Sequence, residues 1–212
     1  MSNNNQSYEV FLNSFTLFDN CNNKKETLAL LSFKWEWPNS KNSLCQKSFA
    51  IKTSREPQTL NYEEGKHNFG DRILFKGGID GRSSINFSIA HINDPGIYGK
   101  ILKSMLNSAV EFIPLAFIRP SVKSIIDEIG FDKKKFSIFG EGFFQFDNYS
   151  DNNGVVTIEL KTPKKIVYPI IDLDTGQDDD DWIDELGDDN YITIQKGETI
   201  AKIELEINQI AS

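Results

Sequence analysis

Hydrophobic and polar positions alternate with a period of two along several stretches of this chain. The clearest stretches are 29–37, 156–161 and 201–207, where apolar side chains occupy every second position. In 29–37 we expect one face, Ala29, Leu31, Phe33, Trp35 and Trp37, to point inward and the other, Leu30, Ser32, Lys34 and Glu36, to face water. Successive side chains of a β-strand point to opposite faces of a sheet, so this alternation is typical of a strand with one buried face. The three stretches therefore predict half-buried antiparallel strands.

Seven further stretches are rich in aromatic and β-branched residues, as strands are. We expect strands at 8–18, 47–53, 72–79, 84–92, 136–146, 166–171 and 191–194. Turn-forming residues separate them, notably Gly77-Gly78 with Asp80-Gly81, the segment 151–154, and Lys196-Gly197. Ten short strands predict a mainly β fold, an antiparallel β-sandwich of eight to ten strands in which residues 1–212 form a single domain.

The segment 97–130 departs from this pattern. Its apolar residues recur at helical spacing and form one stripe of Ile101, Leu102, Met105, Leu106, Ala109, Val110 and Ile113. Pro114 and Pro120 are expected to end or kink that helix, and Ser121 can cap a second helix that ends at Gly130. We expect a helical insertion on an edge or end of the sandwich. It is either a structural cover for an open edge or a helix that contacts a membrane or a partner.

Acidic residues are concentrated in one segment. The chain has 31 Asp and Glu against 23 Lys and Arg, a net charge of −8 at pH 7. Ten of the acidic residues and none of the basic ones lie in 172–189, which leaves 21 acidic residues against 23 basic ones elsewhere. The net charge is therefore a local property of residues 172–189, the acidic segment, which lies between two predicted strands at one end of the sandwich.

Charge and composition argue against several classes of protein. A negative chain without a basic stripe is a poor match for nucleic acid. The most apolar run, 104–118, has 15 residues, includes Glu111 and Pro114, and is shorter than the roughly 20 residues that span a bilayer. The chain begins without the features of a secretory signal, and Cys21 and Cys45 lack the spacing of a zinc site or disulfide framework. We therefore expect a cytoplasmic protein with no transmembrane segment.

The acidic segment is the best candidate for a metal site. Aspartate oxygens crowded on one loop repel one another unless a cation neutralises them, and Ca²⁺ accepts six to eight oxygen ligands in flexible geometry. The EF-hand pattern does not fit, because Gly176 and Gln177 stand where an acid or amide and a glycine are required. The alternative is a solvated acidic loop without metal.

The spacing of three aspartates resembles that of a known calcium-binding loop. Asp172, Asp174 and Asp180 follow an apolar strand and precede Trp182-Ile183. This D-x-D-x5-D arrangement resembles the third calcium loop of the C-two domain family, calcium- and phospholipid-binding β-sandwich modules. The resemblance covers 155–186. It implies that these three aspartates ligate Ca²⁺ at one end of an eight-stranded sandwich.

Other residues of the chain complete or weaken this resemblance. Asp178 and Asp184 are neighbouring carboxylates that can join the ligand set, and Trp182 is the residue expected to contact a membrane or protein partner. For the family's other acidic loop the chain offers only Asp19 and Asp94. The helical insertion and the length of the chain depart from the family pattern.

Motifs for enzymatic chemistry are missing from the sequence. It has no GxSxG elbow, and neither cysteine lies in a recognisable catalytic context. His91 continues the inward alternation of its strand, which favours a core histidine, and His67 lies in a polar loop. A metal-dependent hydrolase with Mg²⁺ on Asp172 and Asp174 is the enzymatic alternative, but no basic or histidine partner lies near them in the sequence.

These observations predict a non-enzymatic binding module. In this hypothesis Ca²⁺ binds the acidic segment, which then presents Trp182 to a membrane surface or a protein partner. The alternative is a metal-independent structural or interaction protein of a larger assembly, whose acidic segment contacts a basic partner. The sequence identifies neither the partner nor the oligomeric state.

Overall fold

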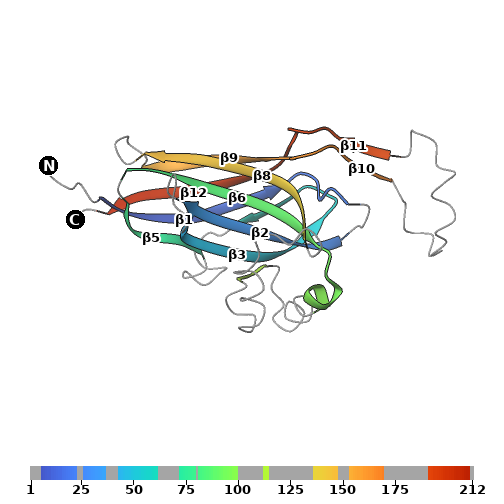
Figure 1. Ribbon diagram of the computed structural model, residues 1–212, viewed down its shortest axis with the longest axis horizontal. Coiled ribbons are helices and arrows are strands. Elements are labelled where there is room, and N and C mark those ends of the chain that lie inside the picture. Colours follow the sequence, from blue (N-terminus) through green and yellow to red (C-terminus); the bar gives the residue numbers. More distant parts are fainter. Residues whose placement is uncertain are drawn as a thin grey trace.

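The alternating stretches of the sequence form antiparallel strands (Figure 1). The computed structural model describes residues 6–22, 26–36, 43–61, 72–79, 81–99, 112–114, 136–147, 153–169 and 191–210. Within them lie twelve strands: β1 (Gln6–Leu17), β2 (Glu26–Glu36), β3 (Ser43–Ser54), β4 (Gln58–Asn61), β5 (Ile73–Ile79), β6 (Arg82–Ile92), β7 (Phe112–Pro114), β8 (Phe136–Asp147), β9 (Gly154–Lys161), β10 (Ile166–Pro169), β11 (Tyr191–Ile194) and β12 (Thr199–Ile210). All ten predicted strands are present, and β4 and β7 are additional.

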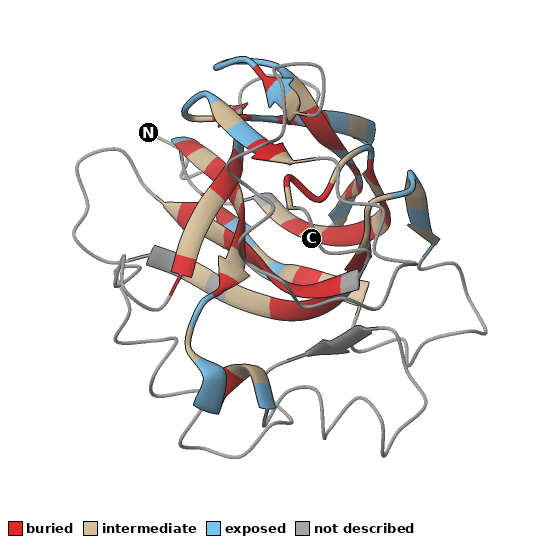
Figure 2. Cartoon of the chain, turned by 90° about the vertical axis from the view of Figure 1, so that its right-hand side faces the viewer, coloured by how far each residue is buried: buried red, intermediate tan, exposed pale blue. Residues whose placement is uncertain are grey.

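Ten strands form one antiparallel sheet that folds over into two layers. Its order is β4-β1-β12-β9-β8-β6-β2-β3-β7, and β5 also pairs with β1. Long ladders join most neighbours, but β8 and β9 share the single residue pair Glu141 and Lys161. At this corner the layer β5-β1-β12-β9 meets the layer β8-β6-β2-β3, and buried residues line the space between them (Figure 2).

At the opposite corner, side chains of β3 contact the backbone of β5. The Cys45 thiol lies 3.3 Å from the Leu74 carbonyl oxygen, and the Lys47 ammonium donates to the carbonyl of Ile73. The sheet is thus nearly closed and barrel-like in outline (Figure 2). The structure confirms the predicted mainly β, antiparallel fold of eight to ten strands.

The core is built from the apolar positions of the alternating stretches. On β2 these positions are Ala29, Leu31, Phe33 and Trp35, and on β12 they are Ala201, Ile203, Leu205 and Ile207; all are fully buried. Trp35 packs against Phe75 and Phe146, and its indole Nε1 donates a 2.6 Å hydrogen bond to the Ser83 hydroxyl. This bond satisfies the one polar atom of a large buried side chain.

The second face of β2 differs from the expectation. Leu30 and Ser32, predicted to face water, are buried, and so is Leu28. Lys34 and Glu36, further along the same face, are half-buried. The first half of β2 is therefore covered on both faces, which the period-two pattern does not reveal. Trp37, predicted to face inward, lies outside the described residues.

The predicted helical insertion, 97–130, lies mostly outside the described residues. One part of it is a strand: β7 pairs antiparallel with β3, with Ile113 opposite Ala50. The assignment of Ile113 to a helical stripe is therefore wrong. The physical reason is that β3 ends the layer, and a paired strand satisfies the backbone groups of that edge. Of the helices that the structure describes, none has the length and apolar character needed to cross a bilayer.

Candidate functional site

The acidic segment is joined to the sandwich by the hairpin of β10 and β11. This two-stranded sheet lies at the end of the molecule opposite to the start of β1 and the end of β12 (Figure 1). Its ladder extends from Ile166 opposite Ile194 to Pro169 opposite Tyr191. Because antiparallel partners lie about 5 Å apart, the two chain ends that flank residues 170–190 are held side by side.

The predicted ligands themselves lie outside the described residues. This applies to Asp172, Asp174, Asp178, Asp180 and Asp184, and also to Trp182. The calcium site thus remains a prediction. In the described ranges no group of three or more His, Cys, Asp or Glu side chains is placed to hold a metal ion.

Two polar contacts fix the hairpin to the sandwich. The Tyr168 hydroxyl donates a 2.6 Å hydrogen bond to Asp19 Oδ2, just beyond the end of β1. Arg55, just beyond β3, lies with its guanidinium 5.7 Å from the centre of the Tyr168 ring and donates to the Pro169 carbonyl oxygen at 3.4 Å. Burial, and then the hydrogen bond to Asp19, raise the pKa of Tyr168 well above its usual range, so this hydroxyl stays a donor. β10 is therefore attached to the sandwich through the hydroxyl and ring of Tyr168 and through the Pro169 carbonyl group.

Asp19 and Asp94, the candidates for a second acidic loop, have different surroundings. Asp19 Oδ1 accepts a 2.6 Å hydrogen bond from the Cys21 backbone amide, so both carboxylate oxygens of Asp19 have partners. Asp94 Oδ1 accepts from the amides of Gly96 and Ile97, at 2.8 and 3.0 Å, and caps a short helical turn. Asp19 is thus bonded to the hairpin that carries the acidic segment, whereas Asp94 has a capping role.

Cys21 and His91 lie near Asp19, and both have structural roles in the turn after β1. Cys21 is buried, with a φ of 53°, which an L-residue seldom adopts. Burial, reinforced by the negative charge of Asp19, raises the pKa of the Cys21 thiol well above its usual range, so the thiol stays protonated. A protonated thiol is a poor nucleophile.

The imidazole of His91 makes contacts that hold the same turn. Its Nε2 lies 2.7 Å from the Asn20 carbonyl oxygen, and its ring stacks on Phe139 with centroids 4.2 Å apart. Burial is the main cause that lowers the pKa of His91, so the ring is neutral and Nε2 donates to this carbonyl. His91 therefore supports the turn after β1, and no hydrogen bond joins it to the Cys21 thiol in the part of the chain that the structure describes.

Sequence reasoning missed the contacts that hold the hairpin. Tyr168 and Arg55 are separated by more than 100 positions in the chain, and neither belongs to a motif. The only local signal is that Tyr168 is an amphipathic residue in a strand that leads into the acidic segment. Such residues usually find a hydrogen-bond partner when they are buried, but the sequence does not name Asp19 as that partner.

Comparisons with known proteins assign no family to this chain. A scan against protein-family models finds no family that matches this chain, and a search of curated proteins finds no match either. The resemblance to the C-two domain family accordingly rests on the aspartate spacing of 172–180 alone.

Proposed function

We propose that the protein is a non-enzymatic binding module that binds Ca²⁺ through its acidic segment and then contacts a membrane surface or a protein partner. The observation that carries this proposal is the anchored hairpin. The pairing of Pro169 with Tyr191 holds the two ends of 170–190 side by side, and the bond between Tyr168 and Asp19 attaches the hairpin to the sandwich.

Electrostatics explains why such a loop favours a dication. Two unit charges about 4 Å apart repel by about 1 kcal/mol in water and by about 4 kcal/mol near a protein surface. The loop carries ten carboxylates and no basic residue between positions 172 and 189. Hard oxygen ligands favour Ca²⁺ over softer transition metals. We expect Asp172, Asp174 and Asp180 to ligate the ion, with Asp178 or Asp184 completing its shell.

The role of Trp182 follows from the same proposal. Neutralising several carboxylates reduces the repulsion within the loop and favours one ordered arrangement of it. An indole ring next to a neutralised loop suits a membrane interface or an apolar pocket on a partner, because the ring is amphipathic. Before Ca²⁺ binds, the negative charge of the loop opposes contact with anionic lipid.

The groups at the base of the hairpin favour binding over catalysis. Asp19, Tyr168, Cys21 and His91 are titratable side chains near that base, and each has a structural partner in the described part of the chain. A hydrolase would need a group free to activate a nucleophile beside the metal. This arrangement supports a site that holds a loop in place.

A second candidate function needs no metal. The net charge of the chain derives from this one loop, so a basic partner would be attracted to it directly. Binding of that kind weakens steeply with added salt and is indifferent to chelators. Calcium-dependent binding, in contrast, is abolished by a chelator at constant ionic strength.

Calorimetric titration with Ca²⁺ tests the proposal. We expect binding heat for the wild type and its loss in the double variant Asp172→Asn, Asp174→Asn. The matched control is Asp188→Asn, Asp189→Asn, which removes the same charge from the same segment outside the predicted ligand set and should keep the heat. A wild-type protein that gives no heat at roughly millimolar Ca²⁺, the weak end of calcium sites, would remove the proposal.

Sedimentation with lipid vesicles separates the two kinds of partner. Vesicles that contain anionic lipid should carry the protein down with Ca²⁺ and release it when EDTA is added, and Trp182→Ala should weaken this binding. If the wild type binds Ca²⁺ but never sediments with vesicles, the partner is a protein.

A further inference from the structure

An open groove crosses the outer face of the layer β8-β6-β2-β3, on the side away from the core. Its volume is about 550 Å³, within the roughly 300–1,000 Å³ typical of small-molecule sites. It is lined from β2 to β8 by Ser32, Lys34, Asn86, Ser88, Glu141 and Phe143, and its far side is formed by residues 161–163 at the end of β9.

Phe143 is the most unusual residue of this groove. It points outward from β8 and is 73% exposed, the largest exposed fraction among the large apolar side chains that the structure describes. Its outward neighbours on the same strand, Glu141 and Gln145, are polar. An exposed aromatic ring beside polar groups offers an apolar face for a ligand to stack on.

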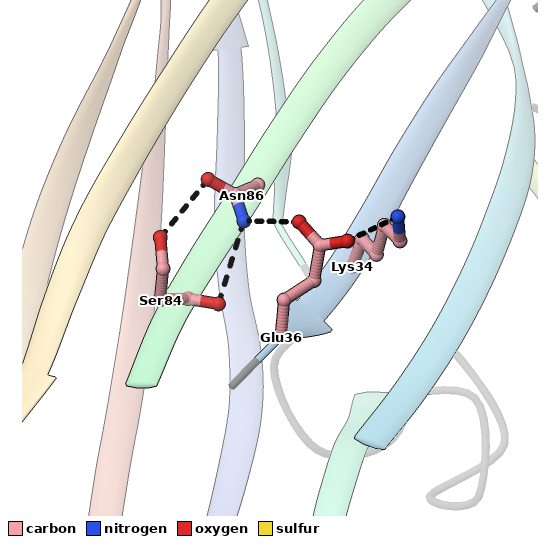
Figure 3. A network of polar contacts seen from close by, with 4 residues as sticks. All are labelled: Lys34, Glu36, Ser84 and Asn86. Carbon is pink, nitrogen blue, oxygen red and sulfur yellow. Dashed lines mark hydrogen bonds and ion pairs between the residues drawn. The ribbon is translucent and has the colours of Figure 1, made fainter. Parts of the chain in front are cut away.

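A hydrogen-bonded network holds the polar groups on one side of the groove (Figure 3). Asn86 Nδ2 donates to Glu36 Oε2 at 3.2 Å, and the Ser84 hydroxyl donates to Asn86 Oδ1 at 3.0 Å. The other oxygen of Glu36 forms an ion pair with Lys34. Asn86 and Lys34 are thus oriented before any ligand arrives, which reduces the entropy that binding must overcome.

The opposite side of the groove is held by Thr162. Its hydroxyl donates a 2.6 Å hydrogen bond to the Gln195 carbonyl oxygen, and its own carbonyl accepts from the Gly197 amide at 2.9 Å. At Gly142 the lack of a side chain lets β8 approach β9 closely, because an added Cβ would lie 2.3 Å from the Glu159 carbonyl oxygen. The groove is therefore a preformed feature of the corner between the two layers.

The lysines of the groove are paired with carboxylates. Lys34 is paired with Glu36, and the Lys161 ammonium lies 3.9 Å from a carboxylate oxygen of Glu159. Glu141 adds one negative charge to the lining. The groove therefore has no excess of positive charge with which to select an anion.

The backbone of the two central groove strands is already used. β6 forms ladders with β2 and β8, and β2 forms ladders with β6 and β3. An extended peptide cannot add to β2 or β6 as a further strand, because strand addition requires an unpaired edge. On the floor of the groove that these two strands form, a ligand is therefore recognised by side chains.

We propose that this groove binds a neutral oligosaccharide. A sugar ring has an apolar face of C–H groups that stacks on Phe143 and hydroxyls that both donate and accept. Glu141 offers acceptors, Lys161 offers donors, and Ser88 offers both. Asn86 offers the second lone pair of its Oδ1, because its Nδ2 already contacts Glu36 and the Ser84 carbonyl oxygen. In the described part of the chain the side chains of Ser88 and Glu141 have no hydrogen-bond or ion-pair partner, so their side-chain oxygens are available. The site is separate from the acidic segment and does not depend on calcium.

Amide chemical shifts measured during saccharide titrations test this proposal on the full chain. The probes are gluco-, manno-, galacto- and xylo-configured oligosaccharides at up to roughly millimolar concentration. We expect shifts at 32–34, 86–88, 141–143 and 161–163 with at least one of them. Phe143→Ala should weaken that binding roughly tenfold, because a stacked ring is lost.

The matched control is Val155→Ala, which also removes an apolar side chain from the outside of the sheet. Val155 is 64% exposed and does not line the groove, so this variant should bind like the wild type. The inference is overturned if no oligosaccharide of the panel shifts the groove amides, or if Phe143→Ala binds as tightly as the wild type. Binding should persist in EDTA and in the Asp172→Asn, Asp174→Asn variant, and its loss there would also contradict a calcium-independent site.

Discussion

The hydroxyl of Tyr168 and the carboxylate of Asp19 form a 2.6 Å hydrogen bond between positions 149 residues apart in the sequence. The bond joins the hairpin that carries the acidic segment to the turn after β1. The same carboxylate also accepts from the Cys21 amide, so one side chain holds both the turn and the hairpin. Asp19 therefore couples the candidate calcium loop to the sandwich.

Tyr168→Phe should destabilise the protein by about 1–2 kcal/mol, because it leaves an acceptor of Asp19 without its partner. The free energy of unfolding in urea measures this loss. Tyr98→Phe is the control, since no hydrogen bond of the Tyr98 hydroxyl is found in the part of the chain that the structure describes. Equal stability of Tyr168→Phe and the wild type would show that the bond does not anchor the hairpin.

Gly142→Ala should lower stability by about 2 kcal/mol, the typical cost of overpacking. The new Cβ would lie 2.3 Å from the Glu159 carbonyl oxygen, a backbone atom that can move only if β8 and β9 separate. Thermal unfolding checks the effect. Gly99→Ala is the comparison, because no heavy atom lies within 4 Å of the Cβ added there, and it should unfold close to the wild type. A Gly142→Ala protein as stable as Gly99→Ala would mean that the two layers meet less tightly at this corner.

Acidification should destabilise the protein partly through His91. Burial lowers the pKa of His91 below 6.5, its ordinary value, so below that pH the unfolded chain binds a proton that the folded chain resists. The contribution of neutral His91 is fully present above pH 6.5 and is lost as the pH falls toward the lower pKa of the folded state. Urea unfolding between pH 8 and 5, compared with His91→Gln, should show a shallower decline in the variant. Parallel curves would contradict this role.

The two cysteines should differ in reactivity. Cys21 is buried and Cys45 is half-buried, and burial raises the pKa of both thiols. A thiol reagent should therefore modify Cys45 first and reach Cys21 only when the protein unfolds. Mass spectrometry of the native and urea-unfolded protein detects the order. Rapid modification of Cys21 in the native protein would point to a reactive thiol instead of a structural one.

Much of the fold could be predicted because the alternation reports burial directly. In β12 the apolar positions Ile203, Leu205 and Ile207 mark both the strand and its inward face. Gly154 and Gly197 adopt positive φ, as the predicted turns require. The short strands β4 and β7 have too few residues for a period to show. The spacing of apolar residues in 97–130 predicted a helix at Ile113, but Ile113 lies in β7, which pairs with β3.

The candidate site was predicted less completely, since its contacts join distant parts of the chain. Local spacing predicts Asp172, Asp174 and Asp180 as ligands, and this stays a prediction because they lie outside the described residues. The bond between Tyr168 and Asp19 depends on how the hairpin meets the sandwich. The exposure of Phe143 is equally hidden, because the run Phe143-Phe144 is apolar on both faces of β8 and does not show which ring points outward. The bond between Tyr168 and Asp19 and the exposure of Phe143 both depend on how the strands pack in three dimensions.

Equilibrium dialysis against Ca²⁺ at physiological ionic strength tests the central claim most directly, because it counts the ions that the chain retains. The account predicts bound Ca²⁺ in the wild type, in Phe143→Ala and in Asp188→Asn, Asp189→Asn, and its loss in Asp172→Asn, Asp174→Asn. A wild-type chain that retains no more Ca²⁺ than this last variant, at roughly millimolar free ion, would contradict the account.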